Sequence, residues 1–200
     1  MITLYELYWS HYCEKVRWAL SFKQLPWTSI HINAFTKREM RHFSAGPRGI
    51  RTVPMIHDTQ LNRVVYESSA ILRFLDDAYP NQPRLFPANP EIARAVYAKL
   101  LELDSLLAVP ARRLGYIQLM LECPTALAHI FLRNQWKGIF ARPFIDRPVS
   151  AVIGMLLVKR FDMHLSEDIG LYEELEVYLL RLALLIEKRQ FIIGDEFTAA

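Results

Sequence analysis

The sequence predicts a small α/β domain followed by an all-α domain. Strand-like and helix-like segments alternate over residues 2–79, whereas only helical periodicity follows the proline-rich stretch 79–90. A helix between two strands favours a parallel βαβ unit. The 200 residues, 52% of them hydrophobic, suffice for two modest domains with cores. We expect domains at 1–79 and 91–200, with a linker at 80–90.

The first domain is expected to run strand, helix, strand, loop, two strands and helix. The segment ITLYELY (2–8) is short, β-branched and aromatic, as buried strands are, and EKVRWALSFK (14–23) changes to helical spacing. The remaining elements are three strand-like runs and one helix with apolar residues at i, i+3, i+4 and i+7. They are 27–33, 53–57, 63–67 and 68–79.

The second domain is expected to contain helices of different lengths. Apolar spacing marks a long helix over 92–107, which Pro110 should stop because proline lacks a backbone N–H. Another helix covers 171–186, preceded by the capping-type residues Ser166 and Asp168. Three prolines should break the region 111–165 into shorter helices: Pro124, Pro143 and Pro148.

The amino-acid composition limits which binding partners and which cellular compartment we expect for the protein. The 24 basic and 21 acidic residues are interspersed, giving a net charge of +3, so we expect no nucleic-acid partner. Two cysteines are too few for a disulfide framework and favour a reducing compartment. The N-terminus lacks the features of a signal peptide, and the longest uncharged apolar run, 149–158, is too short to cross a bilayer. We therefore expect a cytoplasmic protein without a transmembrane segment.

The segment SHYC (10–13) has the spacing of a C-x-x-C redox pair whose first sulfur is replaced by oxygen. Ser10 either caps the following helix or, together with the helix N-terminus, stabilises an anion. Cys13 shares a helical face with Val16 and Leu20, so burial should raise its pKa and make it inert. Its spacing nevertheless makes it the alternative catalytic residue. We expect no metal site, since His11 and Cys13 do not face each other on a helix.

Two further positions each allow a structural and a functional interpretation. Val53-Pro54 either starts a strand, where a proline is tolerated, or forms a cis bond that turns the Val53 backbone toward a peptide-like ligand. Glu67-Ser68 either caps the next helix or forms an anion site beside an acidic residue that meets an ammonium group.

Four segments in this order resemble the glutathione transferase superfamily: SHYCEKVRWAL, GPRG…TVPMI, VYESSAILRFLDDAYP and FIIGDEFTAA. The resemblance implies a thioredoxin-like βαβαββα domain followed by an all-helical glutathione-transferase domain. It implies that Val53 and cis-Pro54 bind the cysteinyl part of glutathione. Glu67 and Ser68 would hold its γ-glutamyl end, and Ser10 would take the activating position of the serine-type classes.

The implied activity is a glutathione transferase of detoxification, acting as a homodimer. It would use glutathione as co-substrate, without a metal, against a small apolar electrophile or a peroxide, with Tyr12 lining the electrophile pocket. One alternative is a glutathione-dependent thiol–disulfide oxidoreductase using Cys13. Another is a non-enzymatic binding protein that uses the region 111–165. The family's T-x-x-D box opens a helix, whereas this chain stops at 198–200, so we expect a helical domain truncated at residue 200.

Overall fold

The computed structural model describes most of the chain, namely residues 1–46, 49–132, 143–163 and 168–200. They form two compact units, Met1–Leu101 with Gln190–Ala200, and Glu102–Arg189. The boundaries between the two units lie between residues 101 and 102 and between residues 189 and 190. The expected linker at 80–90 remains a prediction.

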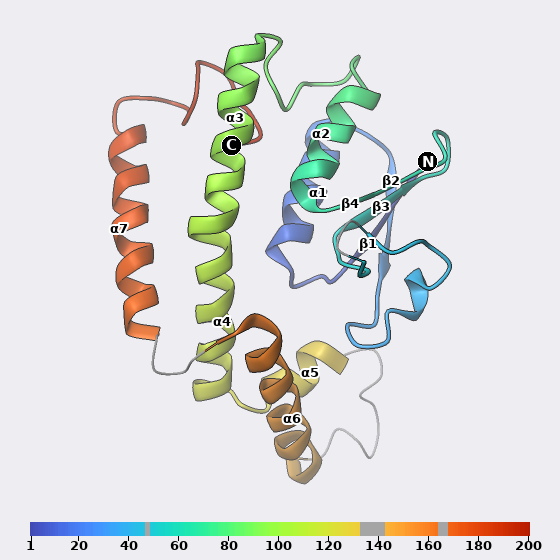
Figure 1. Ribbon diagram of the computed structural model, residues 1–200, viewed down its shortest axis with the longest axis vertical. Helices are drawn as coiled ribbons and strands as arrows, with labels where there is room; N and C mark the ends of the chain where they lie inside the picture. Colours follow the sequence, from blue (N-terminus) through green and yellow to red (C-terminus); the bar gives the residue numbers. More distant parts are fainter. Residues whose placement is uncertain (47–48, 133–142, 164–167) are drawn as a thin grey trace. The chain divides into compact units, whose positions relative to one another are not determined.

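The first unit is built on a four-stranded mixed sheet with the strand order β2-β1-β3-β4 (Figure 1). β1 and β2 are parallel, and β3 is antiparallel to both β1 and β4. The expected strands are therefore confirmed, together with the parallel pair of the βαβ unit. Their bounds are β1 (Ile2–Glu6), β2 (Trp27–His31), β3 (Met55–Asp58) and β4 (Arg63–Tyr66).

Two helices, α1 (His11–Phe22) and α2 (Ser68–Ala78), pack on one face of this sheet (Figure 1). Alternate strand residues point to opposite faces, so Leu4 and Ile56 join the core under the helices, while Tyr5 and Met55 join a smaller cluster on the other face. This arrangement agrees with the predicted thioredoxin-like domain.

The second helix of the βαβαββα pattern is only a 3-10 turn, η1 (Arg38–Met40), in the described residues between β2 and β3. The carboxamide oxygen of Asn33 accepts the backbone N–H groups of Phe35 and Thr36 at 2.9 and 2.8 Å. Lys37 then adopts a left-handed conformation with φ 45°. Asn33 thus caps one helical turn, and the left-handed Lys37 interrupts the helical backbone before η1, which keeps the helix short.

The proline-rich segment after α2 stays within the first unit and leads into α3 (Pro90–Leu103). α3 contributes Ala93, Val96 and Leu100 to the main core. The final segment, 190–200, also belongs to this unit, where the Ala199 N–H donates to the Leu85 carbonyl at 2.8 Å. Residues from both ends of the chain thus complete one core.

The second unit is helical in its described part, as predicted. Its core contains Ile117, Leu127, Ile153, Leu157 and Met163. A five-residue π-helical segment, η2 (Asp104–Ala108), follows α3. The remaining helices are α4 (Val109–Glu122), α5 (Ala126–Leu132), α6 (Pro143–Phe161) and α7 (Asp168–Ile186).

Two predicted helix breaks are wrong. Pro110 does not stop the helix, because it lies in the first turn of α4 directly after η2, where the N–H that proline lacks has no α-helical partner. Pro148 lies inside α6, whose turns continue on both sides of it. The predicted capping residue Ser166 lies outside the described residues, and Asp168 is the first residue of α7.

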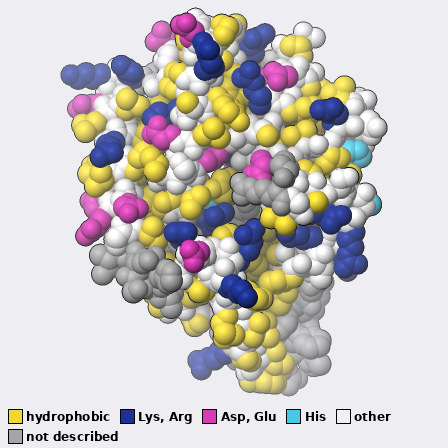
Figure 2. All heavy atoms as spheres, viewed as in Figure 1, with side chains coloured by type: hydrophobic (Ala, Val, Ile, Leu, Met, Phe, Trp, Pro, Cys, Tyr) yellow, Lys and Arg dark blue, Asp and Glu magenta, His cyan; other side chains and the backbone are white. Residues whose placement is uncertain are grey.

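Across the described ranges, no helix combines the length and the apolar character needed to span a membrane. Lys and Arg side chains are interspersed with Asp and Glu on the face drawn in Figure 2. This pattern agrees with the near balance of 24 basic and 21 acidic residues.

Candidate functional site

The register of the sheet brings the predicted site residues to one edge. Tyr5, the next-to-last residue of β1, pairs with Met55 at the start of β3, and Met55 pairs with Tyr66 at the end of β4. The segments that extend each strand beyond this row must therefore lie at the same edge. They are 7–10, 53–54 and 67–68.

Ser10 occupies the N-cap position of α1, with φ −81° and ψ 119°. Its carbonyl accepts the Glu14 N–H at 2.9 Å, which starts the helix. Its side chain makes no capping hydrogen bond and is half-buried. The hydroxyl is therefore not used to cap α1, and it lies within hydrogen-bonding reach of the Cys13 thiol.

Cys13 lies one turn further along α1 and is fully buried. Burial raises the pKa of its thiol, and this effect outweighs hydrogen bonds from the Leu7 backbone and the Ser10 side chain, which lower the pKa. The thiol is thus predominantly protonated at neutral pH and enclosed by protein. Its burial agrees with the helical face that it shares with Val16 and Leu20.

We expect a water-soluble maleimide to label the exposed Cys123 of the native protein much faster than the buried Cys13. The Cys123→Ser variant isolates Cys13 and should react fully only after unfolding in denaturant. Mass spectrometry over time measures both reactions. Rapid labelling of native Cys123→Ser at neutral pH would contradict the buried thiol and support the redox alternative.

The Val53–Pro54 peptide bond is cis, as the resemblance implied. Pro54 is buried at the entrance to β3, and Val53 is half-buried before it. The Val53 backbone consequently stands at the edge of the sheet that Ser10 also occupies.

Glu67 is the N-cap of α2 and has φ 67° and ψ 125°. This left-handed conformation is uncommon for a residue with a side chain, and strained backbone of this kind clusters at ligand-binding sites. Ser68 begins the helix and is buried. The first N–H groups of a helix lack partners within it, so this corner can accept the oxygens of an anion.

Lys15 adds a positive charge to that corner, a contribution that sequence reasoning missed. Its ammonium donates to the hydroxyl of Ser69 on α2 at 3.2 Å and lies 5.8 Å from the centre of the Tyr12 ring. The Tyr12 ring also contacts that of His11, with centroids 4.2 Å apart. The sequence alone does not indicate this contact, because the packing of α1 against α2 must be known before Lys15 can be placed next to Ser69.

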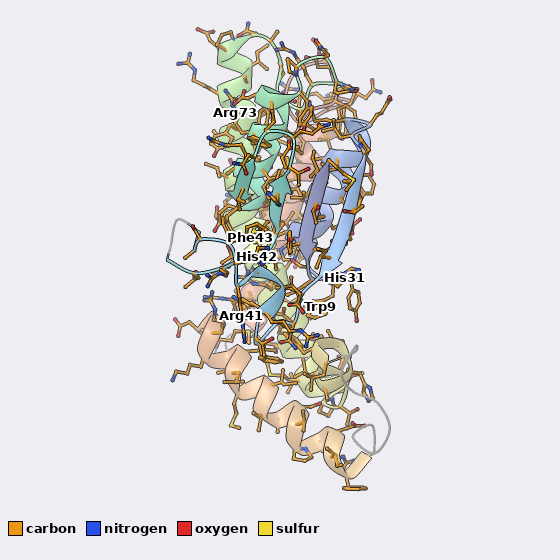
Figure 3. All side chains as sticks on the ribbon, turned by 90° about the vertical axis from the view of Figure 1, so that its right-hand side faces the viewer. Trp9, His31, Arg41, His42, Phe43 and Arg73 are labelled. Carbon is orange, nitrogen blue, oxygen red and sulfur yellow. The ribbon has the colours of Figure 1, made fainter. Side chains whose placement is uncertain are left out.

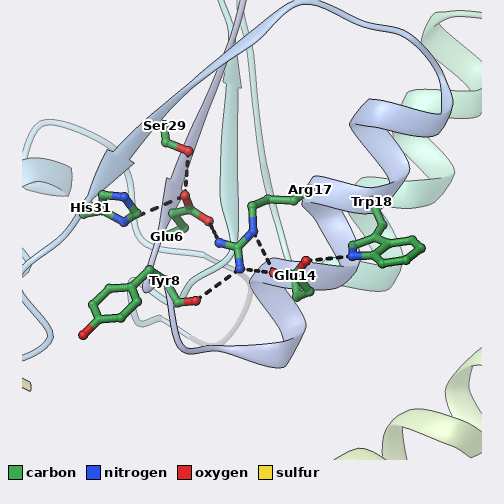
Figure 4. A network of polar contacts seen from close by, with 7 residues as sticks. All are labelled: Glu6, Tyr8, Glu14, Arg17, Trp18, Ser29 and His31. Carbon is green, nitrogen blue, oxygen red and sulfur yellow. Dashed lines mark hydrogen bonds and ion pairs between the residues drawn. The ribbon is translucent and has the colours of Figure 1, made fainter. Parts of the chain in front are cut away.

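A buried carboxylate ends β1 and anchors a polar network (Figure 4). Glu6 has a side chain that is 2% exposed. It accepts hydrogen bonds from the Arg17 guanidinium and, at 2.5 Å, from the Ser29 hydroxyl. His31 Nδ1 lies 3.8 Å from the same carboxylate. One sequence signal pointed here, namely an acidic residue inside an apolar strand.

The segment after η1 is braced by Arg51. Its guanidinium donates to the carbonyls of Phe43 at 2.7 Å and Arg41 at 3.1 Å. The Phe43 ring packs edge-on against Tyr5 and His57, with centroid distances of 5.3 and 5.1 Å. Figure 3 shows Arg41, His42 and Phe43 together on this segment. Arg51 thereby fixes the loop that leads toward β3.

Aromatic rings surround the loop between β1 and α1. The Tyr8 ring meets those of Trp9 and His31 edge-on, at 4.9 and 6.0 Å. In the residues for which side chains are described, no three His, Cys, Asp or Glu side chains gather to hold a metal ion. The site therefore combines a hydroxyl, two helix N-termini and aromatic neighbours.

Comparisons with known proteins agree with this geometry. Residues 4–83 match the family model described as "Glutathione S-transferase, N-terminal domain". The human protein glutathione S-transferase omega-2 is 32% identical over 103 residues. That match covers 52% of this chain and 40% of the relative, so the chain spans less than half of the relative's length.

Solved structures share the fold over nearly the whole chain. The β-etherase LigF from Sphingobium sp. is 14% identical, with a TM-score of 0.67, covering 99% of this chain and 78% of the other. A glutathione S-transferase of Ceriporiopsis subvermispora, solved with glutathione, is 22% identical with a TM-score of 0.59, covering 99% and 80%. These likenesses support a thioredoxin-like domain followed by a helical domain.

Proposed function

We propose that the chain is a member of the glutathione S-transferase superfamily, which the match of residues 4–83 supports, and that it binds glutathione and activates its thiol with the Ser10 hydroxyl. The activated sulfur attacks a small apolar electrophile or a peroxide. The observation that supports this most directly is the half-buried Ser10 at the N-terminus of α1, whose side chain makes no capping hydrogen bond.

The tripeptide is proposed to lie along the edge of the sheet. Its γ-glutamyl carboxylate would accept the N–H groups at the start of α2, beginning with Ser68, and its ammonium would meet Glu67. Its cysteinyl backbone would pair with Val53 beside Pro54. This places the thiol toward Ser10, because all these segments extend strands from the row Tyr5, Met55 and Tyr66.

The energetics suffice to ionise the thiol near neutrality. A cysteine-like thiol has an unperturbed pKa of about 8.5, so only a few per cent is ionised at neutral pH. A hydroxyl donating to the thiolate contributes roughly 1.5–3 kcal/mol, which lowers the pKa by about one to two units. The N-terminus of α1 adds roughly 0.3–1 kcal/mol.

In the conjugation step, the thiol proton leaves to solvent and the thiolate electron pair forms a bond to the electrophilic carbon. The leaving group departs with the electron pair of the bond that breaks, so charge and atoms balance. With a peroxide, the thiolate bonds to one oxygen and the other oxygen leaves with the electron pair of the O–O bond. Tyr12 would contribute to the electrophile pocket. We further propose that the protein acts in the cytoplasm as a homodimer in detoxification.

The oxidoreductase alternative requires Cys13 to attack a disulfide. Full burial and the raised pKa of its thiol both disfavour that role. Failure to bind glutathione would favour the non-enzymatic alternative, and the following titration tests this binding.

We expect glutathione and S-methylglutathione to bind the whole chain, since neither the carboxylate nor the ammonium contacts need the thiol. Glu67→Gln should weaken both affinities by roughly tenfold or more, the range for a lost hydrogen bond to a charged group. Isothermal titration calorimetry measures both. The control Glu91→Gln, an exposed acidic residue in the first turn of α3, should leave them unchanged. Absence of binding by both ligands at millimolar concentration would overturn the proposal.

A further inference from the structure

We propose that Arg17 is a positioning residue for Ser10, because its guanidinium ties together the strand, the loop and the helix that place the serine. The inference rests on the proposed function of Ser10 and names a second residue on which that function depends.

The contacts of Arg17 lie on both sides of Ser10 in the sequence (Figure 4). Its guanidinium binds the carboxylate of Glu6, the last residue of β1. It donates through Nη2 to the Tyr8 carbonyl at 3.2 Å, inside the loop. Through Nε it donates to the Glu14 carboxylate at 2.9 Å, in the first turn of α1. One planar group thus fixes the two ends and the middle of the segment that carries Ser10.

Burial makes this arrangement rigid. The Glu6 side chain is 2% exposed and the Arg17 side chain 20% exposed, so neither charge is fully solvated if the pair separates. Although burial lowers the pKa of Arg17, hydrogen bonds and charge from Glu14 and Glu6 outweigh it and raise the pKa. The guanidinium therefore stays charged over the whole working range of pH.

Arginine is suited to this task by its shape. A guanidinium presents five donors in a fixed fork, whereas a lysine ammonium is a compact charge on a flexible stem. Three acceptors in different directions are thus within reach of arginine alone. Arg17→Lys should keep the charge next to Glu6 but release Tyr8 or Glu14, which allows the loop to shift relative to the N-terminus of α1.

A purely structural role would lower stability without changing the ionisation of bound glutathione. The deciding readout is therefore the pH midpoint of thiolate formation in bound glutathione, measured by the ultraviolet absorbance of the thiolate. Arg17→Lys should raise this midpoint by roughly half to one pH unit, toward that of Ser10→Ala. Its affinity for S-methylglutathione should change less than about threefold, because the ligand-binding groups remain in place.

Lys23→Met serves as the matched control. Lys23 forms a buried ion pair with Asp76 at the opposite end of α1, at 2.7 Å. Its removal should lower the melting temperature and leave the thiolate midpoint at the wild-type value. If Arg17→Lys does not fold, the double variant Glu6→Gln/Arg17→Met replaces it, since no buried charge is left unpaired there. The double variant should raise the midpoint in the same direction.

The outcomes separate the two proposals. A shift for Ser10→Ala together with an unshifted midpoint for Arg17→Lys, or for the double variant used in its place, overturns the positioning role alone. An unshifted midpoint for Ser10→Ala overturns the proposed function, and the positioning role with it. Equal shifts for Arg17→Lys and Lys23→Met would also count against Arg17, because they would show a general response to loss of stability.

Discussion

Replacement of Ser10 by alanine is expected to lower kcat/KM for glutathione conjugation at neutral pH by about 10- to 100-fold. The variant loses the only hydroxyl that the proposal places against the thiolate. The pH at which kcat/KM reaches half its limit should rise by about one to two units, since ionisation then depends on the helix N-terminus and solvent alone. Steady-state kinetics with chlorodinitrobenzene across a pH series measures both effects.

A serine outside this site provides the comparison. The hydroxyl of Ser105 donates to the carbonyl of Glu102, three residues earlier, at 3.0 Å, so Ser105→Ala should retain wild-type kinetics. Binding of S-methylglutathione to Ser10→Ala should also be preserved, which separates activation of the thiol from docking of the tripeptide. Unchanged activity of Ser10→Ala at every pH would remove Ser10 from the mechanism.

Asp76→Ala is expected to reduce the free energy of unfolding by about 3–5 kcal/mol, the range for breaking a buried ion pair on one side. The Asp76 carboxylate accepts the ammonium of the fully buried Lys23 at 2.7 Å. It also accepts the backbone N–H groups of Leu85 and Phe86, at 2.9 and 2.8 Å. The variant therefore strands a buried charge and releases the proline-rich segment from α2.

The neighbouring residue is the control for this experiment. Asp77 has a 69% exposed side chain and lies 3.8 Å from Arg73 in an i,i+4 pair. Asp77→Ala should cost less than about 1 kcal/mol, because solvent screens an exposed pair. Urea denaturation followed by circular dichroism compares the two variants. Similar losses for Asp76→Ala and Asp77→Ala would show that the buried pair is not a major source of stability.

Hydrophobic periodicity in the sequence predicted most of the strands and helices of the first unit. The buried strand that begins with Ile2 and the helix that contains Val16, Ala19 and Leu20 follow directly from periods of two and of about 3.6 residues. The burial of Cys13 could be deduced in the same way, because it shares the face of Val16. Such deductions succeed where one element buries one face against one neighbour.

The incorrect or missing predictions involve contacts between separate elements. The helix continues past Pro110 because the preceding π-helical segment changes the hydrogen-bond register. The local sequence gives no sign of that π-helical segment. From the sequence alone, Arg17 would be expected to be an ordinary solvated charge on α1. Its ion pair with Glu6 can be recognised only from the folded positions of β1 and α1. Glu67 likewise shows its left-handed backbone only in the folded chain.

The return of residues 190–200 to the first unit has a consequence for biosynthesis. Ile193, Ala199 and Ala200 pack against the same core as Ile2 and Leu4. During translation, the strands and helices of this unit emerge long before the segment that covers part of their apolar surface. The nascent domain must wait through the synthesis of the entire second unit before its core is complete, which makes chaperone engagement during that interval advantageous.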